Sequence, residues 1–302
     1  MAKKRSKLIV FVVAGFYEGS SLNRGYQIAQ ELRKQGRRAI VIDVGINWNK
    51  LSRAKLRFIR NAIIIFVKVS SFGATERVKK KNNVVLWDLV DRPVSYFDVL
   101  KERNTQLFDG IIYPNQKVQI DSGQYFNNKI LGCVLYHHWD PRWQFNRAKE
   151  LKLCYIGSIN KYNIIPEYVK IKDINIFENA LKNGVKSGLF KWALAYNLHF
   201  SVRDTKNKGF LYKPNTKVST AAATNSNIIL SNDPSNIELL DRSYPYYTES
   251  ALESVIRTID YAKKTYKSGI WKKGLSMMKE VRERTHVSQI AKDYLRFLSL
   301  FD

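Results

Sequence analysis

The chain has 302 residues and a mass of 35.1 kDa, 45% of its residues are hydrophobic, and 51 Lys and Arg against 26 Asp and Glu give it a formal net charge of +25. This length allows two domains of ordinary size, and the hydrophobic content excludes a disordered chain. No apolar run approaches the roughly 20 residues of a membrane-spanning helix, and residues 1–7 lead into a strand without a cleavage site, so we expect a cytoplasmic protein.

The excess of positive charge constrains the partner. So many positive side chains repel one another, and the simplest way to offset this repulsion is to bind a polyanion. The polyanion would be either a nucleic acid or an anionic membrane surface. The alternative explanation of the positive charge is a lysine-rich surface that binds nothing and is solvated by water. Cys133 and Cys154 lie inside apolar runs, which is typical of small core residues in a reducing compartment and excludes a disulfide framework or a cysteine metal site.

The first half of the chain predicts an α/β domain. Its strands are continuous apolar runs, as expected for parallel strands that helices cover on both faces. Residues 115–128 are polar and predict an exposed, turn-rich connection. A helix is expected over residues 22–35, and strands at residues 7–13, 37–44, 62–69, 84–87, 109–113 and 130–135.

The second half predicts another α/β unit. Strands are expected at residues 152–156, 196–201 and 227–231. Helices are expected at residues 177–184, 219–223, 251–267, 271–283 and 287–301. We find no internal repeat and no long linker in the sequence. The fold is therefore inferred from the order of the predicted helices and strands.

The segment from Tyr212 to Leu240 is a candidate phosphate site. It predicts a basic loop with Lys213 and Lys217, then a short helix of small residues, then a buried strand. Where a loop meets a helix N-terminus beside a parallel strand, free N–H groups and the helix dipole converge on an anion. Arg203, directly after the strand at 196–201, is placed to neutralise a diphosphate. Any α/β domain contains a helix–strand unit of this kind, so a purely structural role stays open.

Two carboxylates follow the strand at residues 84–87. A carboxylate at a strand end can accept the proton of a hydroxyl nucleophile. Asp91 is the first candidate for this base and Asp88 the second, although either would also serve as the cap of a helix that begins near Ser95. Gly15 ends the first strand at the same edge, where open α/β sheets bind ligands. The loop after it lacks the GxGxxG fingerprint, which disfavours a Rossmann dehydrogenase.

Adjacent histidines, His137 and His138, precede Asp140 and Arg142 in the segment YHHWDPR. Neighbouring side chains of an extended segment point to opposite sides, so this pair cannot chelate one metal ion without an unusual backbone. No obligatory metal is expected, although Asp233 leaves the question of a metal open. Each histidine would equally fit as a hydrogen-bonded polar group of the interior.

The order of these features resembles the glycosyltransferases of the two-domain GT-B fold. In them, a loop and small-residue helix like residues 212–223 hold a nucleotide-sugar, and a strand like Ile228–Ser231 follows. Many of these enzymes place a ribose-binding glutamate where this chain has Thr220. The resemblance implies donor-binding roles for Gly15, Gly157, Ser158, Lys161, Arg203, Lys213, Thr216, Lys217 and Thr220.

The segment from Ser70 to Pro93, with its SSFG turn and its Asp-Arg-Pro after an apolar strand, resembles the phage glucosyltransferases that modify hydroxymethylcytosine in DNA. In those enzymes the aspartate after this strand is the catalytic base. Short GT-B enzymes also carry paired histidines before Asp-Pro. The resemblances imply catalytic roles for Asp91, Asp88 and His138, and acceptor-binding roles for His137, Arg92 and Arg142.

The implied fold is GT-B, with two Rossmann-like domains whose mostly parallel sheets face each other across a cleft. Residues 1–147 would form the acceptor-side domain, and residues 148–302 the nucleotide-sugar-binding domain, with the last helix returning to the first domain. The implied donor is a nucleotide-sugar, with a UDP-sugar expected, and a monomer is expected.

Several acceptors and settings remain open. A hydroxymethylated base in duplex DNA is favoured, and a cell-surface or lipid-linked glycan at an anionic membrane is the alternative. Phage or viral origin, and a peripheral place at the inner face of a membrane, are further alternatives. A nucleic-acid-binding protein without enzyme activity is the rival from another class, since the net charge of +25 would suffice for it.

Overall fold

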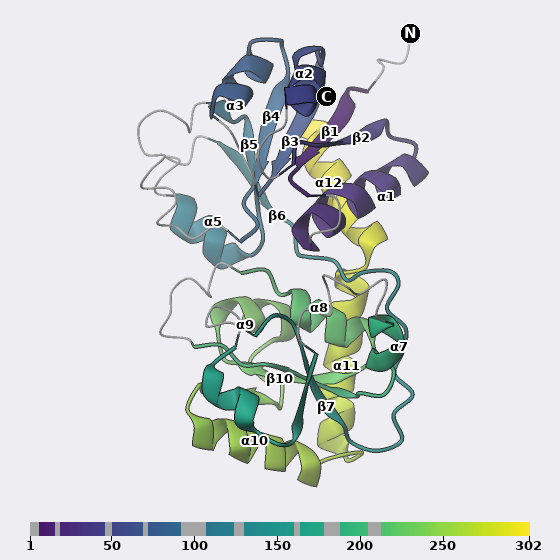
Figure 1. Ribbon diagram of the computed structural model, residues 1–302, viewed down its shortest axis with the longest axis vertical. Helices are drawn as coiled ribbons and strands as arrows, with labels where there is room; N and C mark the ends of the chain where they lie inside the picture. Colours follow the sequence, from purple (N-terminus) through teal and green to yellow (C-terminus); the bar gives the residue numbers. More distant parts are fainter. Residues whose placement is uncertain are drawn as a thin grey trace. The chain divides into compact units, whose positions relative to one another are not determined.

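The computed structural model describes residues 6–15, 19–45, 50–68, 72–91, 107–123, 130–159, 164–177, 188–204 and 213–302 (Figure 1). The chain divides into two compact units. The first contains Met1–His137, Tyr212–Pro214 and Val287–Asp302, and the second contains His138–Leu211 and Asn215–His286. The C-terminal residues therefore return to the unit in which the chain began.

The first unit is built on a six-stranded sheet with the order β2-β1-β3-β4-β5-β6, in which every pair of neighbours is parallel. The central strands are buried along nearly their whole length, because their apolar side chains face helices on both sides. The strands are β1 (Leu8–Val13), β2 (Ala39–Asp43), β3 (Ala62–Val67), β4 (Val84–Asp88), β5 (Gly110–Tyr113) and β6 (Leu131–Val134).

Helices cover both faces of this sheet. One face packs against α1 and α12, through Ile28 and Leu32 of the first and Tyr294 and Phe297 of the second. The other face carries α2 and α3. A π-helix, Ser21–Gln27, leads into α1. The helices are α1 (Ile28–Lys34), α2 (Lys50–Arg57), α3 (Phe72–Lys79), α5 (Gln116–Gly123) and α12 (Val287–Leu298).

The second unit contains a five-stranded parallel sheet with the order β11-β10-β9-β7-β8. Its strands are β7 (Leu153–Ile156), β8 (Ile174–Phe177), β9 (Leu198–Ser201), β10 (Asn227–Ser231) and β11 (Tyr247–Thr248). Its helices are α7 (Leu189–Ala193), α8 (Thr216–Ala223), α9 (Pro234–Leu240), α10 (Leu252–Lys264) and α11 (Gly269–Arg284), with a 3-10 turn at Pro166–Lys170.

Small residues allow close packing in the second unit. Residues Val218–Ala223 of α8 are all buried, and α8 packs against α11. On α11, Gly274 faces the first residue of β10, where a Cβ atom would lie 2.4 Å from Asn227 Oδ1. The side chain of Asn227 donates to the carbonyl of Trp271 at 3.1 Å, so helix and strand are also joined by a hydrogen bond.

Some expectations about single elements were wrong. The polar segment 115–128 was expected to be a connection, but Gln116–Gly123 forms α5 and buries Val118 and Ser122. Phe177, the expected start of a helix, ends strand β8, and the rest of that expected helix lies outside the described residues. Among the described residues, none of the helices has the length and apolarity needed to cross a membrane.

Candidate functional site

The second unit gathers polar residues where its strands end. Strands β10, β9 and β7 are consecutive in the sheet, and each is parallel to the next. The residues that follow these strands therefore share one edge of the sheet. Gly157 and Ser158 follow β7, Arg203 lies just after β9, and Asp233 lies just after β10. Helix α8 connects β9 to β10 and therefore begins at this same edge.

The first turn of α8 lies at this edge, directly after Asn215. Asn215 precedes the helix, but its side chain makes no capping bond. It contacts Ser235 instead: Asn215 Nδ2 donates to the carbonyl of Ser235, and Asn215 Oδ1 lies 3.0 Å from Ser235 Oγ, whose one hydrogen is shared with Asp233 Oδ1. A helix N-terminus carries partial positive charge, so this turn can bind an anionic group.

Lys217 brings a full charge to the first turn of α8. Its Nζ lies 3.6 Å from the centre of the Tyr155 ring, a cation–π contact between α8 and β7. The Tyr155 hydroxyl donates to the carbonyl of Ser158 at 3.1 Å, which fixes the ring. Gly157 has a φ of +154°, and a Cβ atom there would lie 3.0 Å from Tyr155 Oη and 3.4 Å from Lys217 Nζ. Glycine is thus required where backbone and ammonium meet.

Asp233 has a structural role at this edge. It caps α9, because its Oδ1 accepts from the N–H of Asn236 at 3.0 Å and from Ser235 Oγ at 2.7 Å. Its Oδ2 accepts from Asn236 Nδ2 at 2.8 Å and from Ser231 Oγ at 3.1 Å. The described residues contain no group of three or more His, Cys, Asp or Glu side chains that could hold a metal ion.

The other residues expected to bind the donor are placed as follows. Thr216, the first residue of α8, is half-buried, and Thr220, in the second half of the same helix, is buried. Arg203 is buried, with its N–H donating to Ser231 Oγ at 3.3 Å. Lys213 is half-buried directly ahead of the α8 segment, and Lys161 lies outside the described residues. Gly15 belongs to the first unit, so the sheet edge of the second unit does not include it.

In the first unit, Asp91 and Lys68 form an ion pair at the ends of two neighbouring strands. Lys68 follows β3 and Asp91 lies just after β4, with Lys68 Nζ 3.1 Å from Asp91 Oδ2. The backbone φ angles of Lys68 and Asp91 are +63° and +60°, values that residues other than glycine seldom adopt. Such strained residues cluster at functional sites. The Asp91 side chain is 31% exposed, so a substrate hydroxyl can reach it.

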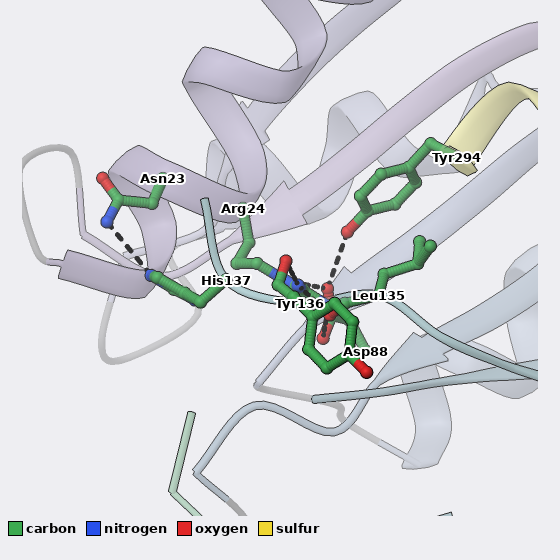
Figure 2. Close-up of polar contacts among 7 residues, drawn as sticks. All are labelled: Asn23, Arg24, Asp88, Leu135, Tyr136, His137 and Tyr294. Carbon is green, nitrogen blue, oxygen red and sulfur yellow. Dashed lines mark hydrogen bonds and ion pairs between the residues drawn. The ribbon is translucent and has the colours of Figure 1, made fainter. Parts of the chain in front are cut away.

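Asp88, the second candidate base, lies in the interior, which corrects that expectation. Arg24 Nε donates to its Oδ2 at 2.8 Å and Nη2 to its Oδ1 at 2.9 Å, and neither side chain is exposed. The Tyr294 hydroxyl donates to Oδ2 at 2.9 Å (Figure 2). Burial by itself lowers the pKa of Arg24, but the charge and hydrogen bond of Asp88, together with Tyr294, raise this pKa by more, so the guanidinium stays charged. Both carboxylate oxygens thus accept hydrogen bonds from within the first unit, which favours Asp91 over Asp88 as the candidate base.

Arg24 also holds the segment that carries the paired histidines. Its Nη1 donates to the carbonyl of Leu135 at 2.7 Å and to that of Tyr136 at 3.0 Å. Asn23 Nδ2 lies 3.0 Å from His137 Nε2, as Figure 2 shows. An amide nitrogen only donates, so Nε2 accepts, and a neutral His137 ring carries its proton on Nδ1.

Two more candidates contact other groups of the protein. His138, the third catalytic candidate, is buried, and its Nδ1 donates to the carbonyl of Trp139 at 2.7 Å. Arg142 binds the carboxylate of Asp140 through Nε at 2.9 Å and Nη2 at 2.6 Å, and its guanidinium lies over the Phe190 ring. Arg92 lies outside the described residues.

Sequence reasoning did not single out the side chains that fix these groups. Tyr155 under Lys217 could have been found, because it lies two residues before a glycine at a strand end. Lys68, as the first cation after a buried strand, carries a similar signal. The contacts of Asp88 carry none, since Arg24 is 64 residues away and Tyr294 is 206 residues away.

Comparison with known structures identifies the architecture. HepE of Anabaena, crystallised with UDP and glucose, aligns with a TM-score of 0.68 and 11% identity over 97% of this chain and 100% of that one. A glycosyltransferase of Rickettsia africae aligns with a TM-score of 0.65 and 11% identity over 98% of this chain and 99% of that one. Both alignments extend over nearly the whole chain and therefore include both parallel sheets. The chain has the GT-B fold.

The GT-B likeness extends to an enzyme that acts on DNA. The DNA-modifying β-glucosyltransferase, studied with and without uridine diphosphoglucose, aligns with a TM-score of 0.58 and 9% identity over 97% of this chain and 100% of that one. No protein-family model matches the sequence, and no curated protein matches it. At such identities, the likeness establishes the GT-B fold, and the chemistry has to be argued from the residues.

Proposed function

We propose that this GT-B protein is a glycosyltransferase that moves a sugar from a nucleotide-sugar, with a UDP-sugar as donor, to a hydroxyl group. The observation that carries the proposal is the edge of the second sheet, where the first turn of α8, Lys217 and the backbone of Gly157 come together. This combination suits a diphosphate. The UDP and UDP-glucose in the similar structures support the choice of donor.

In the proposed reaction, the acceptor oxygen attacks the anomeric carbon of the sugar while the bond from that carbon to the diphosphate oxygen breaks. Asp91 takes the acceptor proton, and Lys68 holds the carboxylate in place. Lys217 and the α8 amides stabilise the charge that develops on the departing nucleoside diphosphate. Arg203 is a further candidate for this role.

Nucleotide binding tests the donor site. We expect UDP to raise the melting temperature of the protein, and ADP, GDP and CMP to raise it less, by ligand linkage. Lys217→Met should weaken UDP binding about tenfold, since it removes one charge-assisted contact. Lys263→Met, which removes an exposed lysine of α10 paired with Asp173, is the matched control and should bind UDP normally. Equal loss in both variants, or no response to any nucleotide, contradicts the donor site.

Replacement of Asp91 tests the base. Asp91→Asn keeps the shape of the side chain and removes the proton acceptor, so we expect a kcat at least about 100-fold lower with UDP affinity retained. Asp88→Asn should act differently, through stability, because its oxygens are held by Arg24 and Tyr294. An Asp91→Asn protein with full activity would remove the base from the proposal.

For the acceptor, we propose a hydroxymethylated base in duplex DNA. The net charge of +25 and the GT-B likeness to a DNA-modifying β-glucosyltransferase support it. A lipid-linked or cell-surface glycan is the second candidate, which the exposed apolar side chains among the cations of the first unit favour.

One experiment separates the acceptors. The protein is incubated with UDP-sugars and with hydroxymethylcytosine-containing DNA, unmodified DNA or a membrane glycolipid extract, and the products are analysed by mass spectrometry. A hexose or pentose increment only on hydroxymethylated DNA supports the first acceptor, and an increment only on glycolipid replaces it. Tight, salt-dependent DNA binding without any transfer or nucleotide response would instead favour a non-enzymatic nucleic-acid-binding protein.

A further inference from the structure

The interior of the first unit contains a hydrogen-bonded group of three side chains, which we call the Arg24 network (Arg24, Asp88 and Tyr294). Arg24 belongs to the π-helix Ser21–Gln27, Asp88 is the last residue of β4, and Tyr294 lies on α12. All three side chains are completely buried. Arg24 makes four hydrogen bonds, two to the Asp88 carboxylate and two to backbone carbonyls (Figure 2).

Stability alone does not account for a charged pair in this place. Removing two charges from water costs free energy that their attraction only roughly offsets, so apolar side chains of similar volume often stabilise an interior equally well. An apolar core, however, makes no directional contacts. A guanidinium group and a carboxylate fix the positions of the groups that they join. The groups joined by the Arg24 network therefore indicate which geometry it serves.

The backbone of Asp88 is bonded directly to Lys68. Lys68 follows β3, the parallel neighbour of β4, and its N–H donates to the carbonyl of Asp88 at 2.9 Å. Lys68 Nζ in turn lies 3.1 Å from Asp91 Oδ2. Arg24 and Tyr294 thus hold the side chain of Asp88, and the carbonyl of Asp88 holds Lys68. The buried network is linked in this way to the pair that contains the proposed base.

The backbone conformation of Lys68 and Asp91 explains why this support is needed. Both residues have φ angles in the left-handed region, at +63° and +60°. Such a conformation costs free energy and persists only where the surrounding structure determines it. The Arg24 network fixes the end of β4, between Lys68 and Asp91. If this anchor is lost, both residues can relax toward ordinary φ angles, and the Asp91 carboxylate then moves.

Arg24 also fixes a second segment of the first unit. Its Nη1 donates to the carbonyls of Leu135 and Tyr136 at 2.7 and 3.0 Å, directly after β6. The next residue, His137, has its Nε2 3.0 Å from Nδ2 of Asn23, the neighbour of Arg24 in the π-helix (Figure 2). Short π-helical turns are frequent at functional sites. Here the π-helix holds both the backbone before the expected acceptor-binding histidine and its ring.

We propose that Arg24 is a positioning residue for the acceptor side of the transfer reaction and that it acts through Asp88 and Tyr294. This role rests on the proposed function, in which Asp91 takes the acceptor proton. Arg24 is buried and does not touch the substrate; it sets the place of Asp91 through the end of β4, and that of His137 through the carbonyls before it. A misplacement of about 1 Å lowers a rate on the order of 100-fold.

The double variant Arg24→Met/Asp88→Val separates positioning from stability. It leaves no unpaired charge in the interior, so we expect a folded protein by circular dichroism. It also removes the side-chain contacts that hold the two segments. We expect unchanged affinity for UDP and a kcat on the order of 100-fold lower. If the Arg24 network only stabilises the fold, kcat measured well below the melting temperature stays near that of the unchanged protein, which overturns the proposal.

Tyr294→Phe is a milder test that keeps the ring in place. It loosens Asp88 and leaves Arg24 on both carbonyls, so we expect a kcat about tenfold lower with the KM of the acceptor unchanged. Asn83→Ala is the control. Asn83 lies at the other end of β4, where its side chain donates to two backbone carbonyls at 3.0 and 2.8 Å. This variant should lower the melting temperature at least as much as Tyr294→Phe but keep kcat. Equal losses of kcat in these two variants, or an unchanged kcat in Tyr294→Phe, contradict the positioning role.

Hydrogen exchange at the Lys68 amide separates a failure of this role from a failure of the proposed function. The measurement needs no reaction, and this N–H is the one that donates to Asp88. By NMR, the amide should exchange at least about tenfold faster in Tyr294→Phe and in the double variant, but not in Asn83→Ala. Faster exchange in a protein that transfers no sugar would remove the proposed function and leave the anchoring of β4. Equal exchange in all four proteins would overturn the anchoring itself.

Discussion

The two units bury polar groups in different ways. The first unit places a full ion pair, Arg24 and Asp88, in its interior and completes it with the Tyr294 hydroxyl. The second unit buries neutral groups: His199 lies beside Thr224, with His199 Nε2 3.2 Å from Thr224 Oγ1, and Tyr244 bonds the backbone of β10. A buried charged pair suffers more from the loss of one partner than a buried neutral group does, because the remaining charge is left without compensation.

The largest expected effect comes from breaking the ion pair. Asp88→Ala leaves the guanidinium of Arg24 buried without its carboxylate, so we expect the free energy of unfolding to fall by about 3 to 5 kcal/mol. Replacing both partners by apolar residues, as in Arg24→Met/Asp88→Val, removes the unpaired charge and should restore part of this loss, but it leaves the Tyr294 hydroxyl and the carbonyls of Leu135 and Tyr136 without these partners. Urea denaturation of the three proteins measures it, and a drop below about 1 kcal/mol for Asp88→Ala contradicts the role of the pair.

Acid should act on the second unit through His199. Burial lowers the pKa of His199 from 6.5 to about 4, so the unfolded chain takes up a proton that the folded protein does not. Stability contributed by the neutral ring is therefore complete above pH 6.5 and is lost as the pH falls toward 4, at about 1.4 kcal/mol per pH unit and about 3 kcal/mol in all.

Comparison with His199→Gln isolates this contribution. The variant lacks the titrating group, so its free energy of unfolding, measured in urea between pH 7 and pH 4, should fall less steeply than that of the unchanged protein. Parallel pH profiles for the two proteins would mean that His199 does not exclude its proton in the folded state.

An added methyl group at Gly274 tests the close packing of α11 against β10 in the second unit without changing any charge. In Gly274→Ala the new methyl group would meet Asn227 Oδ1 at 2.4 Å, and Asn227 is itself bonded to Trp271. Helix α11 must shift or the amide must turn, so we expect a loss of about 2 kcal/mol. Gly269→Ala, at a position in the same helix with open space around it, is the control and should be nearly neutral. Equal losses in the two variants would contradict the close packing at Gly274.

The smallest expected effect is the removal of one hydrogen bond. Tyr294→Phe keeps the ring against Phe11 but removes the hydroxyl that donates to Asp88. Since both Arg24 contacts to Asp88 remain, we expect a loss of about 1 kcal/mol, measured as a shift of the denaturation midpoint at constant slope. A loss as large as that of Asp88→Ala would show that the hydroxyl is essential to the pair.

The strands of both sheets could be predicted well because most are continuous apolar runs. Strand β10, expected at residues 227–231, is observed as Asn227–Ser231. Strand β8 gave no such signal, because only Ile174 of its four residues is buried. Helix α5 was missed for the same reason: its stripe of apolar side chains is too thin to show a helical period.

The candidate site was predictable only in part. Glycine at a strand end and lysine in a loop before an expected helix are local signals, so Gly157 and Lys217 could be named from the sequence, although the helix begins earlier than expected, at Thr216. Asp88 and Asp91 are three residues apart and look alike there. Only the fold, which brings Arg24 and Tyr294 to one of them, determines which carboxylate is buried.

The return of α12 to the first unit has a consequence for the order of folding during synthesis. Tyr294 and Phe297 fill the core beneath β1 and α1, and Lys7 meets Asp302 across 295 residues of chain. Before these last residues are added, α1 covers its face of the first sheet without α12, but every segment of the second unit has been translated at His286. The first unit, whose strands are translated first, can therefore complete its core only after every segment of the second unit has been made, so the contacts of α12 are among the longest in sequence separation.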